Sequence, residues 1–288
     1  MSVNSMWNDL VGASIGYRGK EFKTRVIEAG EGEPLILMHG NGGHAEAYSR
    51  NIMRLSKHFH VIAIDLLWHG FSSGRPFTTE MVPTYAEQLI DLMDSIGADT
   101  AHLEGESLGG WVSMWAALHY PDRVGKIILN TTAGAEVEDG RVTPERLAAG
   151  DALRARSLAA IGDPTRETVR KRLEWLMAEP DRVTEELVTL RQFFYQRPET
   201  REGLTNVMQN SFRSDSPHRI TPQMLGRIRQ STLVLWSDHN PGTGPEFGRK
   251  LASLIPDAQY ACIADAGHWP QWEKPEEHDS VVTEFLLA

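Results

Sequence analysis

The sequence predicts an α/β domain with a mostly parallel sheet, interrupted once by a helical insertion. Between residues 16 and 130, short apolar runs alternate with segments of helical periodicity, which is typical of a parallel sheet flanked by helices. Residues 131–230 show helical periodicity only, and a strand pattern resumes at residue 232. We therefore expect a core made of 1–130 and 231–288, and a helical lid made of 131–230.

The first part of the sheet is expected to hold four strands separated by helices. These strands are the short apolar runs 34–38, 60–65, 101–104 and 126–129. After the second strand, four apolar residues recur at helical spacing: Tyr85, Leu89, Leu92 and Ile96. A further helix is expected after Ser107, and Pro121 ends it because proline cannot continue a helix.

The lid and the second part of the sheet follow in the same way. One apolar stripe in the lid contains Val169, Leu173, Leu176 and Met177. The segment is divided by prolines at 144, 164, 180 and 198. Beyond the lid we expect a strand at 232–236, a helix at 247–255, a strand at 259–263 and a closing helix at 280–287.

Composition excludes several classes of function. The 29 Lys and Arg residues against 39 Asp and Glu give a net charge of −10, the wrong sign for a protein that binds a polyanion such as nucleic acid. The single cysteine, Cys262, permits no intrachain disulfide and no cysteine metal cluster. With no visible secretory signal and no long apolar run, we expect a soluble, cytoplasmic protein. We also expect that it uses no cofactor.

The strongest local motif is Gly105-Glu106-Ser107-Leu108-Gly109, a G-x-S-x-G sequence between an expected strand and an expected helix. Glycines two residues on either side allow a sharp strand-to-helix turn that exposes the serine hydroxyl at the carboxyl edge of the sheet. The motif therefore predicts Ser107 as a nucleophile. The bare motif also occurs by chance, and its place between strand and helix is what favours the catalytic interpretation.

A serine nucleophile needs a base and donors for an oxyanion. His268 follows the last expected strand, and we predict that it is the base. The backbone N–H of Leu108 and one from the glycine loop at 39–43, expected to be that of Gly42, are the predicted oxyanion donors.

With these motifs in place, the chain resembles the α/β-hydrolases, and it is most similar to the hydrolases of meta-cleavage products. Segment 65–72 resembles the turn that follows an early strand in the family. Segment 267–273 resembles the segment around the family's catalytic histidine. The resemblance implies an eight-stranded sheet, possible dimers and hydrolysis of a carbon–carbon bond in a ring-cleavage product of an aromatic compound. It also implies a lid arginine that holds the substrate carboxylate, here Arg191, and further substrate contacts from Trp269 and Asn41. The alternative for Arg191 is an ordinary solvated arginine on a helix surface.

Two departures from the family pattern concern residues at the site. The family places its acid where this chain has Asn240, so either Asp238 reaches the histidine, or the amide takes the acid's place, or activity is low. The residue before the nucleophile is commonly an asparagine, where this chain has Glu106.

The distribution of charge is consistent with an anionic small molecule. Residues 131–230 hold 16 Lys and Arg against 15 Asp and Glu, a balance of +1, which leaves −11 for the rest of the chain. We expect a carbon–carbon bond hydrolase first. The alternatives are a carboxylesterase or lactonase with the same residues, and a small-molecule receptor that has lost turnover.

Overall fold

The computed structural model describes residues 5–72, 74–138, 144–211 and 216–288. Its centre is an eight-stranded sheet in the order β1-β2-β4-β3-β5-β6-β7-β8. Strands β1 and β2 pair antiparallel, as do β2 and β4, whereas the remaining neighbours are parallel. The strands are β1 (Ser14–Arg18), β2 (Thr24–Ala29), β3 (Pro34–Met38), β4 (His60–Ile64), β5 (Ala101–Glu106), β6 (Val124–Asn130), β7 (Thr232–Ser237) and β8 (Ala258–Ile263).

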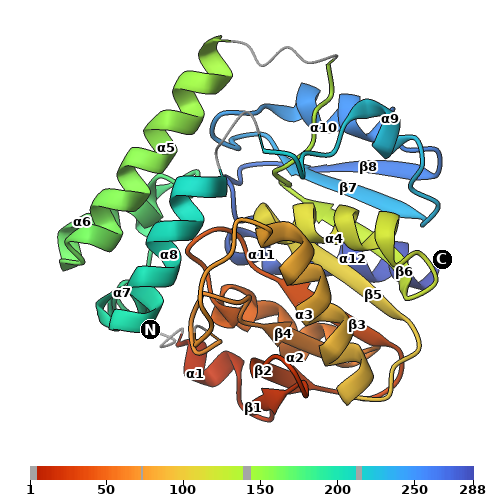
Figure 1. The fold of residues 1–288 in the computed structure, drawn as a ribbon, viewed down its shortest axis with the longest axis horizontal. Coiled ribbons are helices and arrows are strands. Elements are labelled where there is room, and N and C mark those ends of the chain that lie inside the picture. Colours follow the sequence, from red (N-terminus) through yellow and green to blue (C-terminus); the bar gives the residue numbers. More distant parts are fainter. Residues whose placement is uncertain (1–4, 73, 139–143, 212–215) are drawn as a thin grey trace.

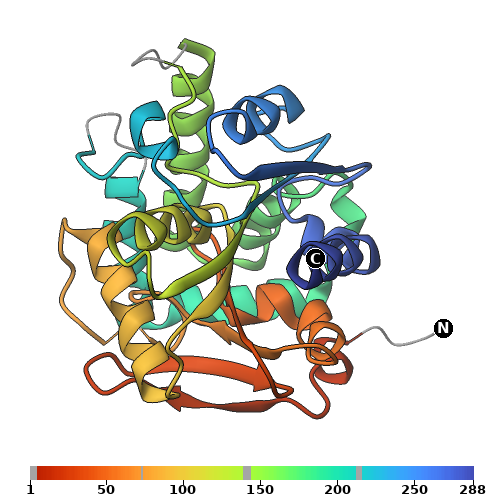
Figure 2. The same ribbon diagram turned by 90° about the vertical axis from the view of Figure 1, so that its right-hand side faces the viewer.

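Helices cover both faces of this sheet (Figure 2). One face carries α3 (Met81–Ser95), α4 (Leu108–His119) and α10 (Pro245–Ala252), and their apolar side chains form one core cluster. The other carries α2 (Ser49–Leu55), α11 (Pro270–Glu273) and α12 (Pro275–Leu287), which join a second cluster. Burial on both faces explains why β3 and β4 are nearly continuous apolar runs.

The insertion between β6 and β7 is helical, as the sequence predicts. It contains α5 (Pro144–Gly162), α6 (Arg166–Glu174), α7 (Glu185–Gln196), α8 (Pro198–Ser211) and α9 (Pro222–Leu225), with a short 3₁₀ turn at Pro180–Arg182. Figure 1 shows α5 to α8 standing together beside the core. The exact division of the chain at residues 130 and 231 into core and lid stays a prediction.

Two strands and several short helical elements, α11 among them, lie outside the sequence prediction. The hairpin β1–β2 forms one edge of the sheet, a four-residue helix α1 (Met6–Asp9) precedes it, and a 3₁₀ turn at Ala45–Tyr48 leads into α2. Within the described residues, no helix is long and apolar enough to cross a membrane.

Candidate active site

Ser107 occupies a strained turn between β5 and α4. Its backbone has φ 51° and ψ −108°, outside the regions that L-residues favour. Glycine is required on either side. A Cβ at Gly105 would lie 2.1 Å from the carbonyl carbon of Gly109, and one at Gly109 would lie 2.3 Å from the carbonyl oxygen of Met38. The two glycines thus let α4 start directly against β3 and β5, with Ser107 at the carboxyl edge of the sheet.

Ser107 borders a cavity of about 210 Å³ together with His268 and Asn41, two of the other predicted site residues. The cavity lies between the core and the insertion, because its walls also include Trp175 of the insertion. Further lining residues are Trp111, Thr131, Thr243, Phe247, Ser211 and Arg219. The fold therefore brings the predicted nucleophile and base to one cavity.

The loop that carries His268 is held by the core and by the insertion. The His268 N–H donates to the carbonyl of Leu176 at 2.6 Å, and its own carbonyl accepts from the Thr131 hydroxyl at 2.9 Å. One residue earlier, the N–H of Gly267 donates to Oε1 of Glu273 at 2.6 Å. These contacts fix the backbone from which the imidazole projects.

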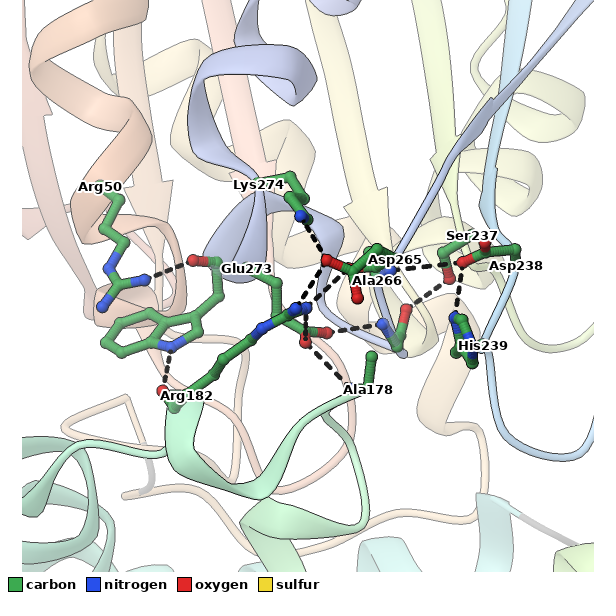
Figure 3. A network of polar contacts seen from close by, with 12 residues as sticks. Arg50, Ala178, Arg182, Ser237, Asp238, His239, Asp265, Ala266, Glu273 and Lys274 are labelled. Carbon is green, nitrogen blue, oxygen red and sulfur yellow. Dashed lines mark hydrogen bonds and ion pairs between the residues drawn. The ribbon is translucent and has the colours of Figure 1, made fainter.

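Arg182 of the insertion adds a second connection to the same loop (Figure 3). Its Nη1 donates to the carbonyl of Asp265 at 2.6 Å and to Oε2 of Glu273 at 2.8 Å, and its Nη2 donates to Oδ2 of Asp265 at 2.8 Å. The backbone N–H of Ala178 reaches the same carboxylate of Glu273 at 2.9 Å. The insertion and the histidine loop are therefore bound to each other by charged hydrogen bonds.

The imidazole of His268 has one polar partner at each nitrogen. Its Nδ1 lies 2.6 Å from Oδ1 of Asn240, and its Nε2 lies 3.0 Å from Oε1 of Glu106. The structure thus places Asn240, the residue at the family's acid position, directly against the predicted base.

Asp238 is directed elsewhere. Its Oδ1 accepts from Nδ1 of His239 at 2.8 Å and from the N–H of Ala266 at 3.3 Å, as drawn in Figure 3. Its side chain is 38% exposed, and the pKa of its carboxyl is lowered because hydrogen bonds from the Asp265 and Ala266 backbone and from His239 outweigh the effect of burial. Among the described contacts, none joins Asp238 to His268.

Of the two predicted oxyanion donors, Leu108 directly follows the nucleophile, and Gly42 belongs to the glycine loop after β3. Leu108 is the first residue of α4, so its N–H belongs to the group that has no partner within the helix. In the glycine loop, the N–H of Gly40 is taken by Oε2 of Glu106 at 2.6 Å. A Cβ at Gly40 would lie only 2.8 Å from that of Ser107, so this loop passes close to the nucleophile. Gly42 has φ 73°, and its carbonyl accepts from the Tyr195 hydroxyl at 3.3 Å.

Arg191 and Trp269 contact each other, and neither is among the residues that line the cavity. The guanidinium lies 5.3 Å from the centre of the Trp269 ring, and Nη1 contacts the Tyr195 hydroxyl at 3.4 Å. Arg191 is 1% exposed, so it is not a solvated surface arginine, and its Nε and Nη2 have no hydrogen-bond partner among the described residues.

Buried histidines surround this arginine on the core side. Burial lowers the pKa of His44 and of His69 to about 4, and the charge of Arg191 acts in the same direction. Both imidazoles are therefore neutral at pH 7. Within the described ranges, no group of three or more His, Cys, Asp or Glu side chains is arranged to hold a metal ion.

Comparison with known proteins decides the family. The model of the alpha/beta hydrolase fold matches residues 33–275. The chain belongs to the α/β-hydrolase family. The fold class and the resemblance predicted from the sequence are thereby confirmed.

Relatives of this α/β-hydrolase include hydrolases of meta-cleavage products. A 2-hydroxy-6-oxo-6-phenylhexa-2,4-dienoate hydrolase of Comamonas testosteroni is 31% identical over 271 residues, covering 92% of each chain. The meta-cleavage product hydrolase CumD of Pseudomonas fluorescens IP01 superposes with a TM-score of 0.79 at 25% identity, covering 96% of this chain and 98% of CumD. A thermophilic esterase from Thermogutta terrifontis has a TM-score of 0.75 at 25% identity, with 95% and 97% covered.

Three residues at the site of this α/β-hydrolase were not predicted to act there. Glu106 contacts the base, Thr243 binds the amide of Asn240, and Arg219 lines the cavity while paired with Glu136 at 2.7 Å. Glu106 alone carried a signal in the sequence, because a carboxylate at the end of a buried strand needs a partner. Thr243 and Arg219 reach the site only through the folding of loops.

Proposed function

We propose that this α/β-hydrolase cleaves a carbon–carbon bond in a carboxylated ring-cleavage product of the 2-hydroxy-6-oxo-dienoate type. In this proposal Ser107 is the nucleophile, His268 is the base, and the N–H groups of Gly42 and Leu108 bind the oxyanion. Asn240 orients the base, and residues 131–230 act as a lid that excludes water from the cavity. The relatives named above support the substrate class.

The observation that carries the proposal is the buried, incompletely paired guanidinium of Arg191. A buried charge without a partner is unfavourable, so such an arginine is expected to bind an anion. A planar guanidinium can hold a carboxylate through two parallel hydrogen bonds. Trp269, in contact with Arg191, and Asn41, on the cavity wall, are then expected to contact the rest of the substrate.

Chemically, hydrolysis adds a hydroxyl to the acyl fragment and a hydrogen to the carbon fragment. His268 accepts the proton of Ser107 while the oxyanion forms, and the two backbone N–H groups stabilise the charge on that oxygen. As the oxyanion collapses, the carbon–carbon bond breaks and the proton on His268 passes to the carbon fragment, which leaves the acyl fragment on Ser107. His268, again neutral, then accepts a proton from the water that releases the acyl fragment.

The role of Arg191 is tested by its substitution. We expect Arg191→Met to raise KM for a carboxylated dienoate by roughly 10- to 100-fold, because it removes charged hydrogen bonds to the carboxylate. The KM for neutral p-nitrophenyl acetate is expected to change by less than about threefold. Steady-state kinetics on the two substrates measure the difference.

Lys171→Met is the matched control, since it removes a positive charge from an exposed face of the insertion, where Lys171 pairs with Glu167. It is expected to change neither KM. An equal effect of Arg191→Met on both substrates would mean that Arg191 does not bind a carboxylate.

A carboxylesterase is the second candidate, supported by the structural similarity to the thermophilic esterase. The fold and the serine–histidine pair do not fix which bond is broken. Turnover of esters combined with no bleaching of the coloured dienoate would favour the esterase.

A further inference from the structure

His268 lies between a neutral amide and a carboxylate. In a serine hydrolase triad the carboxylate contacts Nδ1, whereas here the amide is at Nδ1 and the carboxylate is at Nε2. The acid position is filled by Asn240, whose Oδ1 is 2.6 Å from Nδ1. Among the described residues, the charged group in contact with this imidazole is the carboxylate of Glu106, whose Oε1 lies 3.0 Å from Nε2. This arrangement raises the question of what stabilises the imidazolium that forms during catalysis.

The amide of Asn240 has a fixed orientation. Its Nδ2 donates to the carbonyl oxygen of Thr243 at 2.9 Å and to the Thr243 hydroxyl, also at 2.9 Å. A backbone carbonyl can only accept, so Nδ2 must face Thr243 and Oδ1 must face His268. The Nδ1 of His268 therefore carries a hydrogen, and Nε2 is the basic nitrogen.

This orientation gives the tautomer that a serine hydrolase needs but supplies no negative charge. In a serine protease triad, the Asp to Asn change lowers turnover by about 10⁴-fold because the imidazole takes the wrong tautomer. Here Thr243 removes that cause. The loss of the triad's charge remains uncompensated at Nδ1.

Glu106 is built into the site as a fixed carboxylate. It is 1% exposed, and its Oε2 accepts from the N–H of Gly40 at 2.6 Å. Its Oε1 has no hydrogen-bond partner in the described structure, although it lies 3.0 Å from Nε2 of His268. The contact is thus close without being an aligned hydrogen bond, so Glu106 does not occupy the in-line direction in which Nε2 would accept a proton.

We propose that Glu106 supplies the negative charge that position 240 lacks. It acts as a positioning residue that stabilises the imidazolium of His268 from the Nε2 side. In the step concerned, the O–H bond of Ser107 breaks, an N–H bond forms at Nε2, and the oxygen electron pair attacks the carbonyl carbon as the carbonyl π pair moves onto its oxygen. The inference rests on the proposed roles of Ser107 and His268, but not on the identity of the substrate.

A double-mutant cycle tests this inference with Glu106→Gln, Asn240→Asp and the two combined. The readout is the rate constant for labelling of Ser107 by a fluorophosphonate, with Ser107→Ala as the background and thermal unfolding as the check on folding. Glutamine keeps an oxygen that can accept from Gly40, so the loop contact survives. We expect Glu106→Gln to slow labelling by roughly 100-fold.

The Asn240→Asp variants distinguish the charge of Glu106 from its structural contact with the Gly40 loop. Asn240→Asp is expected to accelerate labelling at least about tenfold more in the Glu106→Gln background than in the wild-type background, because only the former lacks a carboxylate at His268. A residue that merely supports the Gly40 loop would not be rescued from position 240. If Glu106→Gln does not fold, Glu106→Asp, which withdraws the charge by one methylene, is expected to be slower than wild type and to be rescued in the same way.

Three results would overturn the inference. Glu106→Gln could be labelled at the wild-type rate, or the double variant could be labelled as slowly as Glu106→Gln. Asn240→Asp could also accelerate labelling by the same factor in both backgrounds. Failure of the proposed function has a different signature. In that case the cycle behaves as described, yet none of the four proteins bleaches the dienoate.

Discussion

At the scale of single residues, the site rests on the contrast between Asn240 and Asp238. Both follow β7, and the sequence leaves open which of them supports His268. The structure sets the amide oxygen of Asn240 2.6 Å from Nδ1 and directs Asp238 toward His239 and Ala266. An amide held by Thr243 can orient an imidazole as a carboxylate does, without contributing charge.

This contrast gives a direct prediction. We expect Asn240→Ala to lower kcat by roughly 100-fold on any substrate, because the imidazole loses the acceptor that fixes its tautomer and orientation. Asp238→Asn is expected to change kcat by less than about threefold, since its carboxylate lies outside the contacts of His268. Parallel kinetics of the two variants check this, and a larger loss in Asp238→Asn would reassign the residue that orients the base.

The sequence identifies site residues that are marked by a local motif or by their position after a strand. It misses residues whose role depends on a contact with a segment far away in the chain. Ser107 and His268 stand out by a motif and by their position after a strand. The approach of Glu106 to His268 joins residues 162 positions apart, and no spacing rule connects them. In the sequence, Glu106 stands out as a departure from a family pattern and as a carboxylate at the end of a buried strand, but nothing there names His268 as its partner.

At the scale of elements, paired charges explain which strands were missed. In β2, Arg25 and Glu28 are buried, so the strand does not read as an apolar run. Arg25 binds Glu46 at 2.6 Å, and Glu28 pairs with Arg18 of β1. A strand is recognised in a sequence by alternating apolar and polar residues or by a continuous apolar run. A strand whose buried charges are neutralised by partners shows neither pattern.

A buried histidine joins the last helix to the centre of the sheet. His278 of α12 contacts Glu104 of β5 at 2.7 Å and Asp279 at 3.0 Å. Burial disfavours the charged form, but the two carboxylates outweigh it and raise the pKa of His278 to about 10 from 6.5. The imidazolium thus links α12 to β5 at neutral pH.

This linkage predicts how stability depends on pH. Because the folded pKa lies above the unfolded one, the stabilisation is fully present below about pH 6.5 and is lost as pH rises through about 10. We expect His278→Gln to lower the free energy of unfolding by on the order of 3 kcal/mol at pH 6. The difference from wild type should shrink toward pH 10, as measured by urea unfolding.

His58→Gln, at an exposed position, is the control and should show no such trend. If the deficit of His278→Gln were the same at pH 6 and pH 10, the charge of His278 would not be the stabilising factor.

At the scale of the whole molecule, the fold gathers residues from both parts of the chain at one edge of the sheet. Ser107 comes from the first part, His268 and Asn240 from the second, and Arg191 from the insertion between them. The alternation of strands and helices was enough to predict this plan. The order of the eight strands was not predicted from the residues, because pairing between distant segments leaves little trace in local periodicity.

The proposed activity is hydrolysis of a carbon–carbon bond through Ser107. The most direct test incubates the protein with a 2-hydroxy-6-oxo-dienoate in ¹⁸O-labelled water and analyses both fragments by mass spectrometry. We expect the acyl fragment to appear as a carboxylic acid carrying oxygen from the solvent, in equal amount to the carbon fragment, and Ser107→Ala to form neither. An intact dienoate after incubation with the wild type, or unchanged cleavage by Ser107→Ala, would contradict the account.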